Sequence, residues 1–459
     1  MKSILKYMPS VIISTICTIV ITILYGNYLT PDQYGKLNIF TTTISILDVI
    51  FLSFISLSII RFYIIYKNDY EVNLLSTYFI SLMVSLAIIF LMGYLIVGKG
   101  IFYIIIACSG YGLFIFYSNL LRVCERTITF NIIRVLVPIS TIVLLLLNII
   151  IFNKLSLKSV IISSFGPYFV VSLLLTVIYI IKGKIRFEFD FSILKRTMKY
   201  GIPLIGVGLL NLLLAGADRY MIDYYLGSYQ VGIYSFGYRI AELSMINMTH
   251  IIIMGIYPNL IFTFEKKGKK DAEILLTKVL NIHCIIVIPI IFNLLLFIKD
   301  IIGTLFKSYI GAEYIVILIA FGTIFYSISF YVNKAFELTK NTKKMLISLF
   351  IATIINIILN IILIPNIKII GAVVSTLISY IVYIILSIRL SKNLFEVKSN
   401  NKNILIIILL NFITFIIVYI LSKVLPSKLL INVIIGGISY LLIYSLMLYI
   451  FIKNKFLLL

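Results

Sequence analysis

Hydrophobic residues follow one another along this chain in long runs without a period of two, and polar residues are confined to short gaps between them. A helix needs about 20 mostly apolar residues to cross the roughly 30 Å hydrocarbon layer of a bilayer. Such runs start near Pro9, Asn38, Leu74, Ile101, Ile132, Lys158, Gly201, Val231, Lys278, Glu313, Met345, Gly371, Asn403 and Leu429. The apolar residues surround most of each helix, which disfavours a β-barrel. The pattern predicts an all-α polytopic membrane protein with about 14 transmembrane helices.

Composition excludes a soluble protein. Of the 459 residues, 62% are hydrophobic and 12% are charged, whereas a soluble domain has roughly 45–50% apolar and about 25% charged residues. There are too few polar side chains to cover a surface that faces water. The longest gap, Lys182–Met198, has about 17 residues, so no extramembrane domain fits between the spans.

The net charge of +22 is distributed like a topology signal. When alternate gaps are assigned to opposite sides, 28 of the 39 Lys and Arg residues fall on the side of the N-terminus and 9 on the other. A threefold bias over short loops predicts that this side, with both termini, is cytoplasmic. Basic clusters between apolar runs suit anionic headgroups, so no nucleic-acid partner is expected. The first run, Val11–Leu24, lacks a cleavage site and is expected to be retained as a span.

The first and seventh spans begin similar segments of sequence. Leu5–Leu37 and Met198–Tyr234 each hold a basic-aromatic start, a long apolar helix, an aromatic-Leu turn and a glycine opening the next helix, at an offset of 193–197 residues. Leu147–Ile150 and Leu359–Ile362 repeat the order Leu-Asn-Ile-Ile. Six helices per copy keep both copies in the same orientation, so we expect two lobes related by a pseudo-twofold axis along the membrane normal, with a cavity between them.

The repeat predicts four regions. They are an N-lobe of six helices (1–181), a cytoplasmic linker (182–198), a C-lobe of helices seven to twelve (199–391) and a C-terminal helix pair (392–459). The linker contains Phe187 and Phe189 among basic residues. These rings either lie in the headgroup region or belong to a plain solvated linker, and the sequence leaves both interpretations open.

Five charged residues fall within the seventh and eighth spans, where a charge usually faces a cavity or a partner. Arg239 and Glu242 are spaced i, i+3 and share a helix face, so they either neutralise each other or present Arg239 to an anion in a wet cavity. Asp218, Arg219 and Asp223 lie near the outer end of the seventh span. We take Asp218 and Glu242 as candidates for ion coupling.

Three further charges lie in the first six spans. Asp48, midway along the second, is either a protonatable coupling site or a neutral buried acid. Arg61 and Arg134, at cytoplasmic helix ends, either line the inner mouth of the cavity or extend to the interface. Signals for catalysis are missing: no Gly-rich phosphate loop with Lys-Ser/Thr is present, and the four cysteines have no metal-ligand spacing. No catalytic residue, metal, cofactor or enzymatic activity is expected.

Three segments carry a family resemblance. Ala217–Ile240 begins with Ala-Asp-Arg-Tyr, Leu29–Gly35 reads Leu-Thr-Pro-Asp-Gln-Tyr-Gly, and Asn356–Tyr380 holds Asn-Ile-Ile-Leu-Asn followed by Gly-Ala-Val-Val-Ser-Thr. In this order they resemble the O-antigen and capsule oligosaccharide flippases of the multidrug/oligosaccharidyl-lipid/polysaccharide exporter superfamily. The last two helices carry no recognised motif.

The resemblance implies a substrate, a site and a location. The substrate is an undecaprenyl-diphosphate-linked oligosaccharide that crosses from the cytoplasmic to the outer leaflet of the bacterial inner membrane by ion-coupled alternating access. Cationic residues would hold its anionic headgroup: Arg239, at a position usually basic in the family, and Arg219, with Arg61 and Arg134 at the mouth. Polysaccharide polymerase and chain-length machinery are candidate partners.

Three alternatives are weighed against this function. A drug antiporter of the same superfamily typically has twelve spans and a more acidic cavity. A polymerase or ligase needs a long outer loop with Arg or His, and the outer loops here are too short. A peptidoglycan lipid-precursor flippase is the nearest rival, and only the resemblance separates it from an oligosaccharide flippase.

Overall fold

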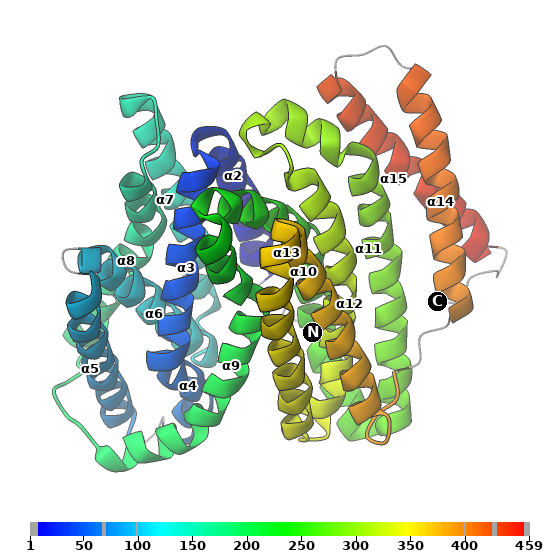
Figure 1. The fold of residues 1–459 in the computed structure, drawn as a ribbon. Coiled ribbons are helices and arrows are strands. Elements are labelled where there is room, and N and C mark those ends of the chain that lie inside the picture. The colour runs from blue at the N-terminus through cyan, green and yellow to red at the C-terminus, as the bar shows by residue number, and fades with distance from the viewer. Residues whose placement is uncertain (1–7, 67–69, 98–99, 398–400, 425–428, 454–459) are drawn as a thin grey trace. The chain divides into compact units, whose positions relative to one another are not determined.

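A computed structural model describes residues 8–66, 70–97, 100–397, 401–424 and 429–453, and no strand occurs among them (Figure 1). The α-helices are α2 (Met8–Tyr28), α3 (Pro31–Phe51), α4 (Ser53–Tyr66), α5 (Glu71–Val97), α6 (Ile101–Val123), α7 (Thr127–Phe152), α8 (Leu157–Ile181), α9 (Phe191–Leu226), α10 (Ser228–Lys267), α11 (Lys269–Leu305), α12 (Ala312–Leu338), α13 (Thr342–Ser391), α14 (Asn401–Val424) and α15 (Leu429–Lys453). A 3-10 turn, Lys307–Tyr309, separates α11 from α12. The prediction of an all-helical polytopic membrane protein is confirmed.

The number of spans agrees with the sequence once two irregular helices are considered. Among the described residues, twelve helices are long and apolar enough to cross a bilayer, and α3 and α4 together pass the same test as a pair bent by 48°. The 50-residue α13 has non-helical backbone at Ile367 and Lys368, so it holds the eleventh and twelfth predicted spans. The described helices thus give up to fourteen candidate spans, the number that the sequence predicts. The predicted boundaries were less accurate, because α3 begins at Pro31 and not near Asn38.

Local geometry explains where α3 begins and how α13 is divided. Thr30 and Gln33 form reciprocal side-chain to backbone hydrogen bonds of 3.3 and 3.2 Å, and proline fits the first helical position because it has no N–H to satisfy. In α13, a Cβ built on Gly371 would overlap the Leu363 carbonyl, although residues eight apart in a straight helix are about 12 Å apart. The chain therefore reverses direction between the two halves of α13.

Packing divides the chain into two units. The amino-terminal unit comprises Lys2–Leu29 and Lys36–Gly216, and the carboxy-terminal unit comprises Thr30–Gly35 and Ala217–Leu459. In the amino-terminal unit, α6 packs against α4, α5 and α8, and α2 packs against α7. The Ser172 hydroxyl donates to the Gly110 carbonyl over 3.0 Å, where the missing glycine side chain lets α8 approach α6 closely.

In the carboxy-terminal unit, α12 packs against α10, α11 and α13. The last two helices pack on each other and on α11. The Tyr440 hydroxyl donates to Asn411 Oδ1 over 2.8 Å, which joins α15 to α14, and the Tyr444 hydroxyl donates to the Ile285 carbonyl over 3.1 Å, which joins α15 to α11. The C-terminal pair is thus fixed to this unit by hydrogen bonds as well as apolar packing.

The predicted regions 1–181, 182–198, 199–391 and 392–459 follow the sequence repeat and stay a prediction, because packing and repeat boundaries need not coincide. The helix α9 begins inside the predicted linker and crosses from one packing unit to the other. Large hydrophobic side chains remain exposed along most helices, among them Ile64, Ile128 and Ile150. Such a surface suits hydrocarbon and not water.

Candidate functional site

Asp218 lies in α9 at the centre of a buried polar cluster in the carboxy-terminal unit. Its carboxylate accepts a hydrogen bond from the Tyr234 hydroxyl and one of 3.4 Å from the Thr376 hydroxyl. Within the part of the chain that the structure describes, the other carboxylate oxygen, Oδ1, has no hydrogen-bond partner. A buried carboxylate with an open oxygen is expensive in a membrane-spanning helix unless a proton or a cation occupies it.

The polar cluster continues along α10 and α13 through tyrosine hydroxyls. The Tyr238 hydroxyl lies 2.7 Å from that of Tyr380, and the Tyr380 ring stacks on Tyr326 with centroids 4.5 Å apart. The Arg219 guanidinium lies over the Tyr238 ring at 5.1 Å from its centroid. The cluster therefore connects the predicted residues Asp218 and Arg219 to hydroxyl groups on α10 and α13, and the stacked Tyr326 ring adds a contact with α12.

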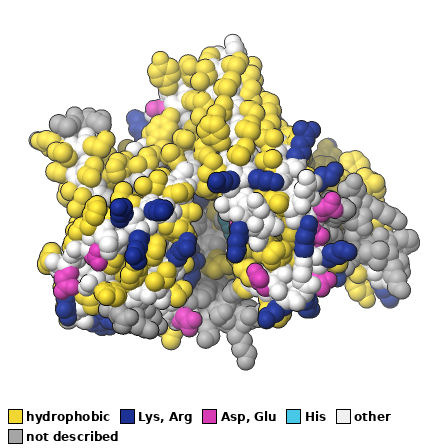
Figure 2. All heavy atoms as spheres, turned by 90° about the horizontal axis from the view of Figure 1, so that it is seen from below, with side chains coloured by type: hydrophobic (Ala, Val, Ile, Leu, Met, Phe, Trp, Pro, Cys, Tyr) yellow, Lys and Arg dark blue, Asp and Glu magenta, His cyan; other side chains and the backbone are white. Residues whose placement is uncertain are grey.

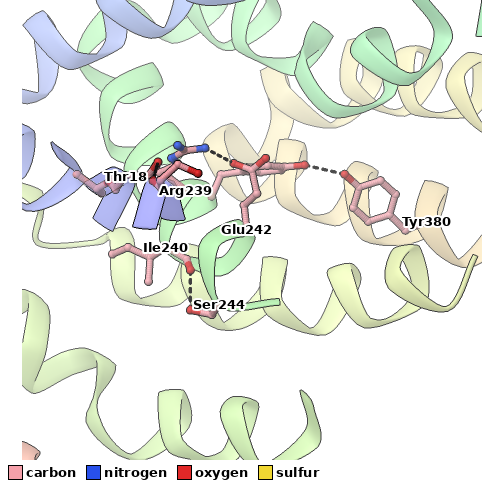
Figure 3. Close-up of polar contacts among 9 residues, drawn as sticks. Thr18, Arg239, Ile240, Glu242, Ser244 and Tyr380 are labelled. Carbon is pink, nitrogen blue, oxygen red and sulfur yellow. Dashed lines mark hydrogen bonds and ion pairs between the residues drawn. The ribbon is translucent and has the colours of Figure 1, made fainter. Parts of the chain in front are cut away.

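Arg239 and Glu242 are joined by an ion pair, as Figure 3 shows. Arg239 Nη1 lies 2.8 Å from Glu242 Oε2 in the i, i+3 arrangement. Both side chains keep about one third of their surface accessible, 36% and 34%. The sequence left open whether Arg239 and Glu242 neutralise each other, and in this conformation the two side chains do form an ion pair.

Asp48 is the isolated acid of the amino-terminal unit. It is 5% exposed and lies one turn before the bend between α3 and α4, where Leu52 N–H donates to its carbonyl over 2.8 Å. A Cβ built on Gly112 would lie 3.0 Å from Asp48 Oδ1, so the glycine leaves room for the carboxylate. Among the described residues, no group donates a hydrogen bond to this oxygen.

Arg61 and Arg134 lie on different helices of the same unit, and each cation covers an aromatic ring. Arg61 Cζ lies 4.7 Å from the Tyr200 ring centroid, and Arg134 Cζ lies 5.5 Å from that of Phe130. Arg61 is exposed and Arg134 is half-buried. The structure does not join these two residues, and their place at an inner mouth stays a prediction.

Two buried asparagines of α13 were not among the site residues predicted from the sequence. Asn356 and Asn360 are fully buried in α13, and the Asn360 amide donates to Asn356 Oδ1 over 3.0 Å. In the described part of the chain, Asn360 Oδ1 and Asn356 Nδ2 have no partner. The detectable signal was two asparagines spaced i, i+4 in an apolar run, followed by Ser375 and Thr376 after the turn.

Lys334 of α12 was also missed. Its ammonium donates to both Glu337 carboxylate oxygens at 2.7 and 2.8 Å and lies over the Tyr257 ring at 4.3 Å. It lies one turn before the end of α12. Across the described ranges, no group of three or more His, Cys, Asp or Glu side chains is placed to hold a metal ion.

Comparison with known proteins shows the same architecture. The family model described as polysaccharide biosynthesis protein matches residues 1–264, and a second model, MatE, matches residues 203–362. A solved structure of the lipid II flippase MurJ in an inward closed conformation superposes with a TM-score of 0.72 at 18% identity, covering 98% of this chain and 99% of MurJ. An inward-facing multidrug resistance MATE transporter gives 0.65 at 15% identity, covering 83% and 94%.

A curated relative comes from Haloferax volcanii. The probable low-salt glycan biosynthesis flippase Agl15 is 25% identical over 182 residues, which is 39% of this chain and 38% of Agl15. The match thus spans less than half of that relative. The first family model, in contrast, covers more than half of this chain and includes both Asp48 and the Asp218–Glu242 region. The chain therefore belongs to the polysaccharide biosynthesis protein family, within the superfamily that also contains the multidrug exporters.

Proposed function

We propose that this protein is a flippase that moves an undecaprenyl-diphosphate-linked oligosaccharide from the cytoplasmic to the outer leaflet of a bacterial inner membrane. The observation that carries the proposal is a partly accessible cation, Arg239, inside a helix of a chain that belongs to a polysaccharide biosynthesis family. The transported oligosaccharide would be used to assemble a surface polysaccharide. Both termini of the protein would lie in the cytoplasm. A polymerase and chain-length machinery would act after it.

The chemistry of the substrate sets what the site must provide. Sugars and a diphosphate cannot cross hydrocarbon unaided, because each hydrogen bond and charge removed from water adds kcal/mol to the barrier. The prenyl chain, in contrast, can stay in lipid. Arg239 is held by Glu242 on the same helix face, so an arriving diphosphate competes for a cation that is already oriented. Arg219, held over Tyr238, supplies a second positive charge. Arg61 and Arg134 would receive the headgroup at the mouth.

We assign ion coupling to Asp218, with Asp48 and Glu242 as further candidates. Asp218 offers an open carboxylate oxygen, Oδ1, while its Oδ2 accepts from the Thr376 hydroxyl. Oxygen ligands suit hard cations such as Na⁺ as well as protons. Binding a cation there neutralises a buried charge. The resulting change in the packing of α9 against α13 would favour one of the two alternating states.

Deletion of the gene, followed by analysis of lipid-linked intermediates, tests the proposed function. We expect one oligosaccharide diphospholipid to accumulate on the cytoplasmic face, together with loss of the surface glycan. Complementation with the wild-type chain and with Arg239→Gln separates a transport defect from a secondary effect of the deletion. A normal surface glycan with altered drug sensitivity would overturn the proposal and favour a drug antiporter.

A peptidoglycan lipid-precursor flippase is the second candidate. The observation that favours it is the superposition on MurJ over 98% of this chain, compared with 83% for the MATE transporter. The two substrates share a polyprenyl diphosphate and differ in the sugar portion. Rescue of cells depleted of their own lipid II flippase would support this candidate, and failure of rescue with a restored surface glycan would support an oligosaccharide substrate.

A further inference from the structure

The segment Lys182–Asp190, which we call the strap, connects α8 to α9 and is fixed to the first turns of α5. Arg186 N–H donates to the Ser76 hydroxyl over 2.8 Å, and Asp190 N–H donates to the Thr77 hydroxyl over 3.0 Å. Lys184 forms an ion pair with Glu71, the first residue of α5. These three contacts hold the backbone of the strap against the end of a span.

The contacts with α5 also set the depth of the strap. The span in α5 runs from Glu71 to Tyr94, 24 residues, which at about 1.5 Å per residue is about 36 Å and exceeds the roughly 30 Å hydrocarbon layer by only a few ångströms. Ser76 and Thr77 are the sixth and seventh residues of this span, about 8–9 Å from its first residue. If this span is centred in the bilayer, the strap contacts α5 near the boundary between headgroups and acyl chains.

Three phenyl rings at this depth point away from the protein. Phe187 is 98% exposed, Phe189 49% and Phe191 68%, whereas Ile185 is buried. Leaving an exposed phenyl ring in water forgoes about 1.5–3 kcal/mol relative to burying it. In the headgroup region, apolar rings enter the acyl boundary while neighbouring polar groups remain hydrated.

Basic residues flank these rings along the sequence. Lys182, Lys184 and Arg186 belong to the strap, and Lys195, Arg196 and Lys199 to the first turns of α9, against the acids Glu188 and Asp190. Glu188 lies 3.8 Å from Arg186, with both side chains exposed. Hydrogen bonds from the Ser192 hydroxyl and N–H lower the pKa of Asp190, whose charge thereby caps α9. The first turns of α9 run along the lower edge of Figure 1, and the face seen from below carries many Lys and Arg side chains (Figure 2).

We propose that the strap and the first turns of α9 form a docking surface for anionic phospholipid headgroups. Phe187 and Phe191 insert at the acyl boundary, and Arg186 with Arg196 pairs with lipid phosphates. An anionic phospholipid is the expected ligand because the strap lies near the end of a span, its aromatic rings are exposed and its basic residues outnumber its acidic ones. The inference is independent of the transported substrate and assigns a lipid-binding surface where the sequence alone left a plain linker as an equal interpretation.

The chain contains no tryptophan, so Phe187→Trp creates a single fluorophore on the docking surface. The full-length variant is reconstituted in phosphatidylcholine vesicles with and without phosphatidylglycerol, and quenching by brominated acyl chains is compared with quenching by aqueous iodide. N-acetyltryptophanamide in the same suspension is the water-exposed control. Phe191→Trp repeats the measurement if the first variant does not fold.

We expect strong quenching by brominated lipids and protection from iodide, with both effects larger when phosphatidylglycerol is present. A basic residue near an anionic surface contributes on the order of a fivefold change in binding, so adding Arg186→Gln should weaken the phosphatidylglycerol effect about fivefold. Lys154→Gln, an exposed loop position at the other end of α8, should leave it unchanged. Iodide quenching equal to that of the free control, without quenching by brominated lipids, would overturn the proposal and indicate a water-facing surface.

Discussion

Gly35 of α3 and Gly232 of α10 meet with their backbones in direct contact. A Cβ built on Gly35 would overlap the Ser228 carbonyl oxygen, and one built on Gly232 would overlap that of Pro31. Pro31 precedes Gly35 by four residues, as Ser228 precedes Gly232, and the two glycines are 197 residues apart. The contact is therefore reciprocal and follows the sequence repeat.

Adding one methyl group at this crossing should separate the helices. We expect Gly232→Ala to lower stability by about 1–3 kcal/mol, because an overpacked site forces backbone shifts, and the thermal unfolding of purified protein in detergent measures it. Gly255→Ala, in the same helix with nothing within 4 Å of a built Cβ, is the matched control. Equal melting temperatures for the two variants would contradict the close approach.

Arg239→Gln should reduce flipping by about tenfold or more, which corresponds to about 1.4 kcal/mol of lost interaction with the diphosphate. Arg389→Gln, an exposed arginine near the end of α13, should have little effect. For both variants, the measurement is the rate at which a fluorescently labelled polyprenyl-diphosphate oligosaccharide crosses between the leaflets of proteoliposomes.

The double variant Arg239→Glu with Glu242→Arg separates binding from folding. It restores an i, i+3 ion pair, so we expect expression and melting temperature close to wild type. The cation moves about 4.5 Å along the helix, and transport should stay low. Wild-type transport by this variant would show that the pair only neutralises itself.

Asp218→Asn should uncouple transport from the driving ion. The amide oxygen still accepts the Tyr234 hydrogen bond, so the protein should fold, but the charge that attracts a cation is gone. We expect flipping to lose its response to an imposed sodium or proton gradient, whichever drives the wild type. Asp223→Asn, one turn later with its carboxylate bonded to the Ser228 hydroxyl, should keep the response. A gradient response that survives Asp218→Asn would remove Asp218 from the coupling site.

Tyr440→Phe should loosen the C-terminal helix pair. The hydroxyl is buried and donates to Asn411 Oδ1, and a lost hydrogen bond of this kind typically costs about 0.5–1.5 kcal/mol. Tyr449→Phe, at an exposed position of the same helix, is the control. Limited proteolysis at the α14–α15 end should accelerate only for Tyr440→Phe, and identical cleavage rates would contradict the assignment.

The sequence predicted the parts of the fold that depend on hydrophobic length. Spans such as α6 and α8 were placed within a few residues, because the bilayer fixes the length of an apolar helix. Residues 31–37 of α3 and the first ten residues of α9 were missed, since capping and interfacial packing extend helices beyond the apolar run. The Arg239–Glu242 pair followed from i, i+3 spacing.

The remainder of the candidate site depended on contacts between distant segments. Asp218 could be identified as an intramembrane acid, but its partners Tyr234 and Thr376 lie on two other helices, the second 158 residues away. A lone buried tyrosine or threonine in an apolar run gives no sign of such a contact. Only the paired asparagines at 356 and 360 carried a pattern that sequence reasoning can use.

The most direct test of the central claim uses purified protein in vesicles that contain a fluorescently labelled polyprenyl-diphosphate oligosaccharide in both leaflets. A membrane-impermeant reductant bleaches the outer leaflet alone unless the lipid is exchanged across the bilayer. We predict that wild-type protein allows the label of both leaflets to be bleached, first in the outer leaflet and then, as lipid crosses the bilayer, in the inner leaflet. Arg239→Gln should slow the bleaching of the inner-leaflet label by about tenfold, the loss argued above. Bleaching that stops at the outer leaflet with wild-type protein, as in empty vesicles, even with a sodium or proton gradient applied, would contradict the account.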